Sequence, residues 1–374
     1  MARRGPRAPS SEEVDSEAPI QRIRPDGRVV DGQTVDLAPD RLESLFRGML
    51  RIRVLDARML NLQRQGRIGF FGQCTGQEAA IVGSAAAARP EDWVLPALRE
   101  AGVALFRGYP IRTLLAQLAG RASEVSQGRQ MPCHHSFRAG NFVSMSSVIG
   151  TQLPHAAGIA RAAQIRGDDV AVVGYLGDGA SSSSDFHSAL NFAAVWKAPV
   201  LFFCQNNQWA ISVPFSKQSA TKSVAEKAAA YGMPGIRVDG NDVVAVLEET
   251  TRALDSVRSG DGPVLLEALT YRRLGHSSSD DPTRYREDAE VEKWKARDPI
   301  ERLRLYMRRE GLLDQAQEDR VEEEIHQEIS AAVESMERDE SPSLESLVDD
   351  VFVERSVALQ EQIRALMAYV ATVA

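Results

Sequence analysis

Short apolar runs alternate with helix-forming stretches through the middle of the chain, and this alternation constrains the fold more than any other feature. Strands that alternate with helices of this length form βαβ units and a parallel sheet. Runs that are apolar throughout indicate strands covered on both faces. We therefore predict an α/β fold with a parallel sheet flanked by helices. The predicted strands are Val170–Leu176, Pro199–Cys204, Gly235–Val238 and Pro263–Thr270, and the predicted helices between them are Asp185–Trp196, Val224–Tyr231 and Val243–Ser256.

The chain is expected to have three regions, which are a flexible, solvated tail at 1–35, an α/β domain at 36–290 and a helical extension at 291–374. Apolar residues at three- and four-residue steps predict that the domain opens with a helix over Asp36–Gly66. A second helix, rich in small residues, is predicted over Glu78–Ala88. In the extension, Val321–Met336 repeats the same steps with acidic residues between them. Such a helix either binds a partner or packs on its own domain, and the pattern favours the second.

The 374 residues carry a net charge of −8 and three widely separated cysteines. A nucleic-acid binder usually shows a basic domain or stripe, so we expect no nucleic-acid partner. The cysteines cannot form a disulfide framework and fit a reducing compartment. No apolar run approaches the roughly 20 residues that span a bilayer, so no membrane association is expected. Acidic residues follow the N-terminal arginines at once, unlike in a transit peptide, and we expect a cytoplasmic protein.

Glycine and oxygen-bearing residues follow two consecutive predicted strands. Gly177-Asp178-Gly179-Ala180 closes the first strand, and Asn206-Asn207-Gln208-Trp209 closes the next one, a single crossover helix later. In a parallel sheet both segments reach the carboxyl edge, where open α/β sheets bind ligands. The glycines allow backbone N–H groups to approach an anion. Carboxylate and amide oxygens suit Mg²⁺ that is shared with phosphate oxygens.

This combination resembles the thiamine diphosphate fingerprint, with two unrelated turns as the alternative. Over about residues 40–355 the chain looks like the α subunits of the decarboxylating component of branched-chain 2-oxo acid dehydrogenases. The stretches that carry the resemblance are Arg99-Glu-Ala-Gly-Val, Gly128-Arg-Gln-Met-Pro, Ser146-Ser-Val-Ile-Gly-Thr-Gln, Ile236-Arg-Val-Asp-Gly-Asn-Asp and Tyr271-Arg-Arg-Leu-Gly-His-Ser-Ser-Ser-Asp-Asp-Pro-Thr-Arg-Tyr-Arg. The resemblance implies a thiamine-diphosphate-binding fold and oxidative decarboxylation of branched-chain 2-oxo acids.

The resemblance also implies roles for individual residues. Mg²⁺ would be held by Asp178, the side chain of Asn207 and the backbone carbonyl of Trp209. The residues implied to contact thiamine diphosphate are Arg99, Ser147, Ile149, Gly177, Gly179 and Ala180, with Arg99 paired to the diphosphate and Ile149 supporting the bent cofactor. A possible K⁺ site is implied for Ser146, Thr151 and Gln152.

His276 matches the active-site histidine of the family, which exchanges protons near neutral pH. The loop Ser277–Arg286 would order around the channel mouth and dock the lipoyl-bearing acyltransferase, which receives the acyl group; a flexible hydrophilic loop is the alternative. In the family, the glutamate that activates the cofactor comes from a separate β subunit. We therefore expect an assembly of two α and two β subunits and no activity from the chain alone.

Several residues depart from the family pattern. Ser183-Ser184 replaces Glu-Gly or Glu-Ser, Leu98 and Trp209 stand where tyrosine is common, and Gln205 stands where arginine sometimes occurs. The last change puts cofactor affinity in doubt. Two alternatives stay open. One is a pyruvate or acetoin dehydrogenase α subunit, because the sequence does not fix the size of the substrate pocket, for which Phe70, Phe71 and Cys74 are the candidate lining residues. The other, motivated by the altered Ser181–Ser184 run, is a non-catalytic α-like protein.

Cys133-His134-His135 invites comparison with a zinc site. Adjacent side chains diverge, however, and no second pair of ligands lies at zinc spacing. We expect no zinc at this position.

Overall fold

The computed structural model describes residues 18–349 and 351–373. Its main sheet has five parallel strands in the order β1-β2-β3-β7-β6. The predicted α/β class is confirmed. The strands of this sheet are β1 (Trp93–Leu95), β2 (Val172–Gly177), β3 (Val200–Asn206), β6 (Gly235–Asp239) and β7 (Val264–Leu269), and a small antiparallel pair is formed by β4 (Trp209–Ala210) and β5 (Val213–Pro214).

Helices make up most of the remaining structure. The α-helices are α1 (Pro39–Arg64), α2 (Glu78–Ala87), α3 (Ala101–Phe106), α4 (Ile111–Ala119), α5 (Gln152–Arg166), α6 (Ser184–Trp196), α7 (Phe215–Gln218), α8 (Val243–Ser259), α9 (Asp288–Lys295), α10 (Pro299–Arg309), α11 (Gln315–Glu337) and α12 (Val357–Val373). The 3₁₀ turns are η1 (Arg138–Gly140), η2 (Asp178–Ser182), η3 (Ala225–Tyr231), η4 (Pro282–Arg284) and η5 (Leu344–Leu347).

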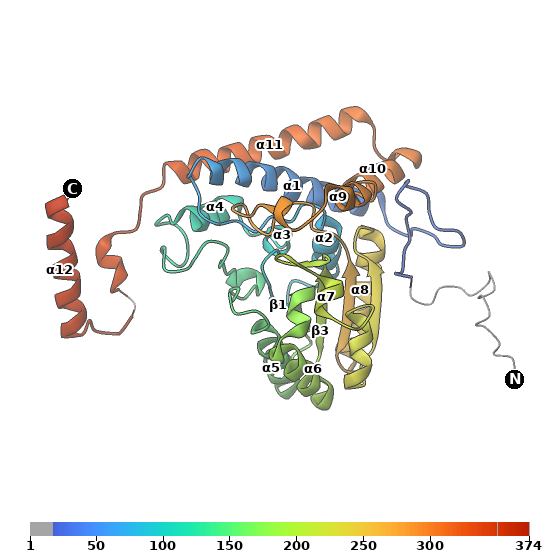
Figure 1. Ribbon diagram of the computed structural model, residues 1–374, viewed down its shortest axis with the longest axis horizontal. Coiled ribbons are helices and arrows are strands. Elements are labelled where there is room, and N and C mark those ends of the chain that lie inside the picture. The colour runs from blue at the N-terminus through green and yellow to red at the C-terminus, as the bar shows by residue number, and fades with distance from the viewer. Residues whose placement is uncertain (1–17, 350, 374) are drawn as a thin grey trace, which may run out of the picture.

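The sheet is covered on both faces because its strand side chains alternate between two cores. On β3, Leu201 and Phe203 join the core formed with α1, α2, α8 and α11, whereas Phe202 and Cys204 join the core formed with α5 and α6. Figure 1 shows α5 and α6 on the side of the molecule opposite to α1 and α11. The continuous apolar runs of the sequence correspond to this double burial.

Two sequence predictions differ from the structure, and one strand of the sheet was missed. The segment Val224–Tyr231 forms a 3₁₀ turn rather than an α-helix. The edge strand β1 was not predicted, because three residues are too few for a periodic pattern. The N-terminal tail does not extend to residue 35. Ile20 pairs with Val238 at the edge of the sheet, and Ile23 is buried. The predicted tail at 1–17 lies outside the described residues.

The C-terminal region contains two different kinds of helix. The apolar stripe of α11 packs in the main core beside α1, where Arg47 and Arg51 pair with Glu324 and Glu328. The interpretation of this stripe as a helix packed on its own domain is therefore confirmed. In contrast, α12 stands away from the body of the molecule (Figure 1), and Ile363 is the one residue buried among those described in it. Among the described residues, no helix combines the length and apolar character that crossing a bilayer requires.

Candidate active site

Four loops that follow parallel strands meet at the carboxyl edge of the sheet. They carry Arg99 after β1, Asp178 after β2, Asn207 after β3 and His276 after β7. The loops after β2 and β3 start level with one another because Gly177 pairs in register with Gln205. A cleft at this edge is where open α/β sheets bind ligands. The topology therefore gathers four residues that are spread over 177 positions of the chain.

The carboxylate of Asp178 lies against Asn207, as the sequence predicts. It accepts a hydrogen bond from Gln218 Nε2 over 2.8 Å. Asp178 is 1% exposed, and this burial raises its pKa to about 6, while hydrogen bonding, first from Gln218, and the Arg272 guanidinium act in the opposite direction. Among the described residues no lysine or arginine side chain contacts this carboxylate, and a carboxylate so poorly solvated is stabilised by binding a cation.

The hairpin of β4 and β5 presents the backbone carbonyl of Trp209, the third predicted Mg²⁺ ligand. Its oxygen accepts a hydrogen bond from Arg272 Nη1 over 3.2 Å and has a second lone pair. The Trp209 ring points elsewhere, since it packs on Tyr285 and donates from Nε1 to Glu290 Oε1. Tryptophan in place of tyrosine therefore alters packing around the loop and leaves the carbonyl available.

Glycine at position 179 allows the two loops to approach closely. A Cβ atom added to Gly179 would lie 2.7 Å from the Cβ of Ala210, which is closer than real Cβ contacts. The backbone of η2 therefore fits against the hairpin only without a side chain. Gly177 has open space around the corresponding position, and Ala180 is buried in the core.

These observations test whether the site suits Mg²⁺ and a diphosphate. The donor set consists of one carboxylate, one amide and one backbone carbonyl, all oxygen ligands of the type that Mg²⁺ takes. The carboxylate is buried and contacts no cationic side chain within the described part of the chain, and the absent side chain at Gly179 leaves its backbone open to an anion. The residues present therefore suit Mg²⁺ and a diphosphate.

Arg99 and His276 contact each other at the same carboxyl edge of the sheet. Arg99 Nη2 donates to the carbonyl oxygen of His276 over 2.8 Å and lies 3.3 Å from His276 Nδ1. Since guanidinium groups only donate, Nδ1 acts as the acceptor and the ring proton sits on Nε2. Burial, followed by the charges of Arg99 and Arg272, lowers the pKa of His276 to about 4. The ring is thus neutral at physiological pH.

The segment that carries Ser147 and Ile149 lies beside the β2 loop. Gln152 donates to the carbonyl oxygen of Tyr175 on β2, and the backbone at Gly150 lies against Ser183. The Ile149 side chain is 65% exposed. The position of Ile149 against a cofactor, and the K⁺ site of Ser146, Thr151 and Gln152, stay predictions.

Two further predictions, the docking loop and the substrate pocket, concern the surroundings of the site. The loop Ser277–Arg286 is tied down, since Asp280 accepts from the His276 N–H and bonds Tyr285, and Ser278 exchanges hydrogen bonds with Phe71. Phe71 and Cys74 are buried in the main core. Neither observation tests docking or substrate choice.

Two departures from the family pattern have structural explanations. Ser183 caps α6, since its Oγ accepts the N–H of Phe186. Gln205 is buried and donates to Glu100, whose pKa burial raises to about 7. An arginine at this position would meet the same carboxyl group. The effect of glutamine on cofactor affinity stays open.

The histidines of the Cys133-His134-His135 motif have partners other than a metal. His135 stacks between Tyr109 and Phe142, with ring centroids 5.3 and 5.4 Å away. His134 Nε2 lies 2.6 Å from Ser147 Oγ. Within the described residues, no group of three or more histidine, cysteine or acidic side chains could hold a metal ion.

Comparison with known proteins identifies the family. The family described as "Dehydrogenase E1 component" matches residues 47–345. The chain belongs to this family. A relative from Mycobacterium tuberculosis (strain CDC 1551 / Oshkosh), "3-methyl-2-oxobutanoate dehydrogenase subunit alpha", is 46% identical over 310 residues, which cover 82% of each chain. The resemblance inferred from the sequence motifs is confirmed.

More distant E1 relatives cover nearly the whole chain. The "2-oxoisovalerate dehydrogenase subunit alpha, mitochondrial" of Homo sapiens is 38% identical over 362 residues, or 96% of this chain and 81% of the relative. The "2-oxoisovalerate dehydrogenase subunit alpha 2, mitochondrial" of Arabidopsis thaliana is 38% identical over 355 residues, or 94% and 75%.

Three side chains that support the site were not predicted from the sequence. Gln77 bonds Asn207, Gln218 bonds Asp178, and Arg272 bonds the carbonyl of Trp209. Gln218 lies on the short helix α7, and Arg272 falls within a stretch that carries the resemblance. Gln77 follows Gly76, a residue type common in turns, and precedes Glu78, a residue type common at helix starts. No local sequence pattern distinguishes Gln77 as a functional residue.

Proposed function

We propose that the chain is the α subunit of a branched-chain 2-oxo acid dehydrogenase, the oxidoreductase that decarboxylates these acids with thiamine diphosphate and Mg²⁺. The observation that carries the proposal is the meeting of Asp178 with Asn207 at adjacent strand ends, with Arg99 and His276 beside them. The names of the relatives support the choice of branched-chain 2-oxo acids as substrates. When bound, thiamine diphosphate would accept the electrons that loss of carbon dioxide leaves behind.

Different residues of this chain would bind Mg²⁺, bind the diphosphate and transfer a proton. Asp178, Asn207 and the Trp209 carbonyl would hold Mg²⁺, and through it the diphosphate, while Gly177, Gly179 and Ala180 would offer backbone contacts. Arg99 would pair with the diphosphate. His276, neutral and protonated on Nε2, would donate that proton to a substrate oxygen and take it back.

Partner subunits complete the proposal. The carboxylate that activates thiamine diphosphate would come from a β subunit, in an assembly of two α and two β chains. A lipoyl-bearing acyltransferase would then receive the acyl group, with Ser277–Arg286 as its docking loop. A cytoplasmic location, like a K⁺ ion at Ser146, Thr151 and Gln152, remains part of the proposal.

The test is to co-express the chain with a β-type subunit and to measure decarboxylation of 2-oxoisovalerate and pyruvate, and carbon–carbon cleavage of acetoin. We expect activity only from the assembly, with 2-oxoisovalerate preferred. Pockets that differ by one methylene discriminate by about 1–3 kcal/mol, so the ranking of substrates is measurable. Full turnover by the lone chain would contradict the proposal, and a preference for pyruvate or acetoin would reassign the substrate.

The non-catalytic alternative predicts a different result in calorimetry. An assembly that binds no thiamine diphosphate in the presence of Mg²⁺ would support that alternative, whereas Mg²⁺-dependent binding would favour the enzyme.

A further inference from the structure

Two buried amide side chains face each other beside the proposed Mg²⁺ ligands. Asn207 Nδ2 donates a hydrogen bond to Gln77 Oε1 over 3.0 Å. Gln77 is 0% exposed and Asn207 is 6% exposed, so water has little access to either group. Each amide could in principle be turned over, because its oxygen and nitrogen have nearly the same shape.

The backbone N–H of Trp209 decides between the two orientations. It donates to Asn207 Oδ1 over 3.3 Å. A backbone N–H can only donate, so it requires the oxygen of Asn207 at this position. The nitrogen of Asn207 then faces Gln77, and Gln77 must present its oxygen in return. Gln77 Nε2 is left buried without a partner in the described structure, which is the energetic cost of this arrangement.

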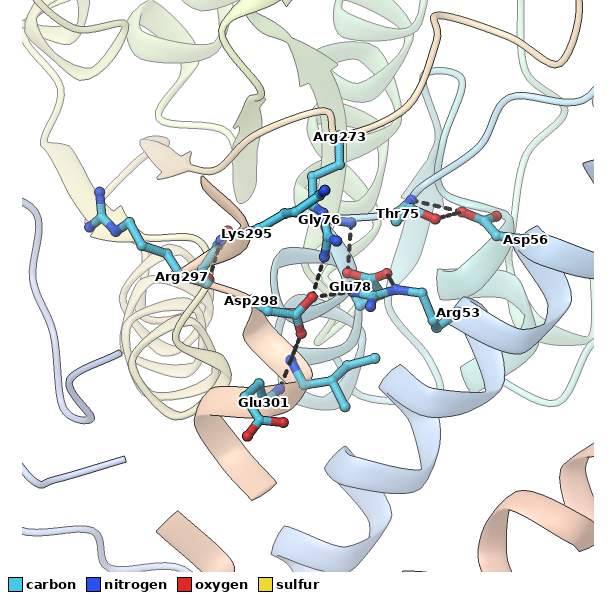
Figure 2. A network of polar contacts seen from close by, with 12 residues as sticks. Arg53, Asp56, Thr75, Gly76, Glu78, Arg273, Lys295, Arg297, Asp298 and Glu301 are labelled. Carbon is cyan, nitrogen blue, oxygen red and sulfur yellow. Dashed lines mark hydrogen bonds and ion pairs between the residues drawn. The ribbon is translucent and has the colours of Figure 1, made fainter. Parts of the chain in front are cut away.

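The backbone that leads into Gln77 is held by buried carboxylates. Asp56 Oδ2 accepts the N–H groups of Cys74 and Thr75 over 2.6 and 2.7 Å, and Figure 2 shows the contact with Thr75. Glu78 Oε2 accepts the N–H of Gly76 over 2.9 Å, and its other oxygen pairs with Arg53. Gln77 therefore starts α2 from a fixed backbone and can hold another side chain in place.

The surroundings of Gly76 also fix the backbone conformation immediately before Gln77. Its φ is +98°, and an added Cβ would lie 2.4 Å from the carbonyl oxygen of Tyr271. Thr270 Oγ1 also donates to the carbonyl of Gly76 over 2.9 Å. The loop before α2 is thus tied to the segment after β7, which leads to His276.

We propose that Gln77 is a positioning residue that acts on the Nδ2 side of the Asn207 amide while the Trp209 N–H acts on the Oδ1 side, so that the two contacts together keep the oxygen of Asn207 as the atom available to Mg²⁺. This inference rests on the proposed function, because it assumes a cation at Asp178 and Asn207. An amide turned the other way would present an NH₂ group, which cannot bind a cation. Residues that orient a metal ligand in this manner typically change metal affinity by about 10- to 100-fold.

A double-mutant cycle with Asn207→Asp separates orientation from general stability. In an aspartate both terminal atoms are oxygen, so its orientation no longer matters for the metal. The assembly of this chain with its β-type partner is titrated with Mn²⁺ in the presence of thiamine diphosphate. We expect Gln77→Met to raise the Kd for Mn²⁺ by about tenfold or more beside Asn207, and by less than about twofold beside Asp at position 207.

Two further variants keep the test decisive. Gln77→Glu retains an acceptor oxygen for Asn207 Nδ2 and should bind Mn²⁺ at least as well as the wild-type protein, even if the methionine variant does not fold. Gln117→Met removes a buried glutamine that bonds only the backbone at Met131 and Cys133, and it should leave Mn²⁺ affinity unchanged.

Equal losses of Mn²⁺ affinity from Gln77→Met beside Asn207 and beside Asp at position 207 would overturn the positioning role. Weaker Mn²⁺ binding by Gln77→Glu would overturn it as well. Either result would leave the proposed function intact. Failure of the wild-type assembly to bind Mn²⁺ with thiamine diphosphate would instead refute the proposed function, and this inference with it.

Discussion

Arg99 Nη2 donates to the carbonyl oxygen of His276 over 2.8 Å and lies 3.3 Å from its ring nitrogen Nδ1. Burial lowers the pKa of His276 to about 4, and the charge of Arg99 is the next cause. We expect Arg99→Met to raise this pKa toward the ordinary value of 6.5. Histidine ring NMR, assigned by comparison with His276→Gln, measures the titration. Arg107→Met, which removes an arginine bonded to backbone carbonyls elsewhere, should not change it.

A wild-type His276 that titrates near 6.5 would contradict this prediction, because the ring would then be solvated rather than enclosed with Arg99 and Arg272.

The carboxylate of Asp178 leads to a second prediction, for Asp178→Ala. The variant removes a charged group that belongs to neither apolar core, and within the described residues Gln218 is the one side chain that hydrogen-bonds to it. We expect Mg²⁺-dependent binding of thiamine diphosphate to weaken by at least about 100-fold, beyond the range for outer residues. The melting temperature without cofactor should fall little, since the buried charge is lost with the side chain.

Calorimetry on the assembly measures the binding, and Asp185→Asn, on the following helix, serves as the control. Undiminished binding in Asp178→Ala would refute the assignment of the metal site.

The elements of this fold that could be predicted are those marked by patterns of neighbouring residues in the sequence. The runs that became β2, β3, β6 and β7 are local patterns, and burial on both faces made them continuous. Asp178 and Asn207 were predictable together because strand ends in a parallel sheet share an edge. Arg99 and His276 were each assigned to the site only through the family resemblance, and their contact with one another was not predicted, since 177 positions separate them in the chain.

Other features could not be predicted because tertiary contacts decide them. Residues 18–35 are polar enough to suggest a tail, yet Ile20 extends the sheet edge and Asp242 accepts the N–H groups of Arg22 and Ile23. Gln77 gains its role from Asn207, which lies 130 residues away. Neither the partner nor the burial of that glutamine can be read from its neighbours in the chain.

The buried Asp56 should make stability depend on pH. Burial, followed by the charge of Glu78, raises its pKa from 3.8 to about 7. The folded state therefore binds this proton more tightly than the unfolded chain. The resulting stabilisation is complete below about pH 4 and is lost as the pH rises to about 7.

Asp56→Asn keeps an acceptor oxygen for Cys74 and Thr75 but removes the titration. Relative to this variant, the wild-type protein should lose on the order of 2 kcal/mol of unfolding free energy between pH 5 and pH 8. Urea unfolding at the two pH values measures the difference, with Asp40→Asn, on the exposed first turn of the same helix, as the control. The same pH dependence in Asp56→Asn and wild type would contradict the prediction.

The contact between Gly179 and Ala210 leads to the last prediction. A Cβ at position 179 would lie 2.7 Å from the Cβ of Ala210, so Gly179→Ala must push the hairpin that carries the Trp209 carbonyl away from η2. Overpacking of this kind costs about 1–3 kcal/mol, and we expect weaker Mg²⁺-dependent binding of thiamine diphosphate. Adding Ala210→Gly removes the opposing atom and should restore most of the affinity in calorimetry. If the double variant binds no better than Gly179→Ala, the lost affinity comes from the Gly179 backbone itself and not from displacement of the hairpin.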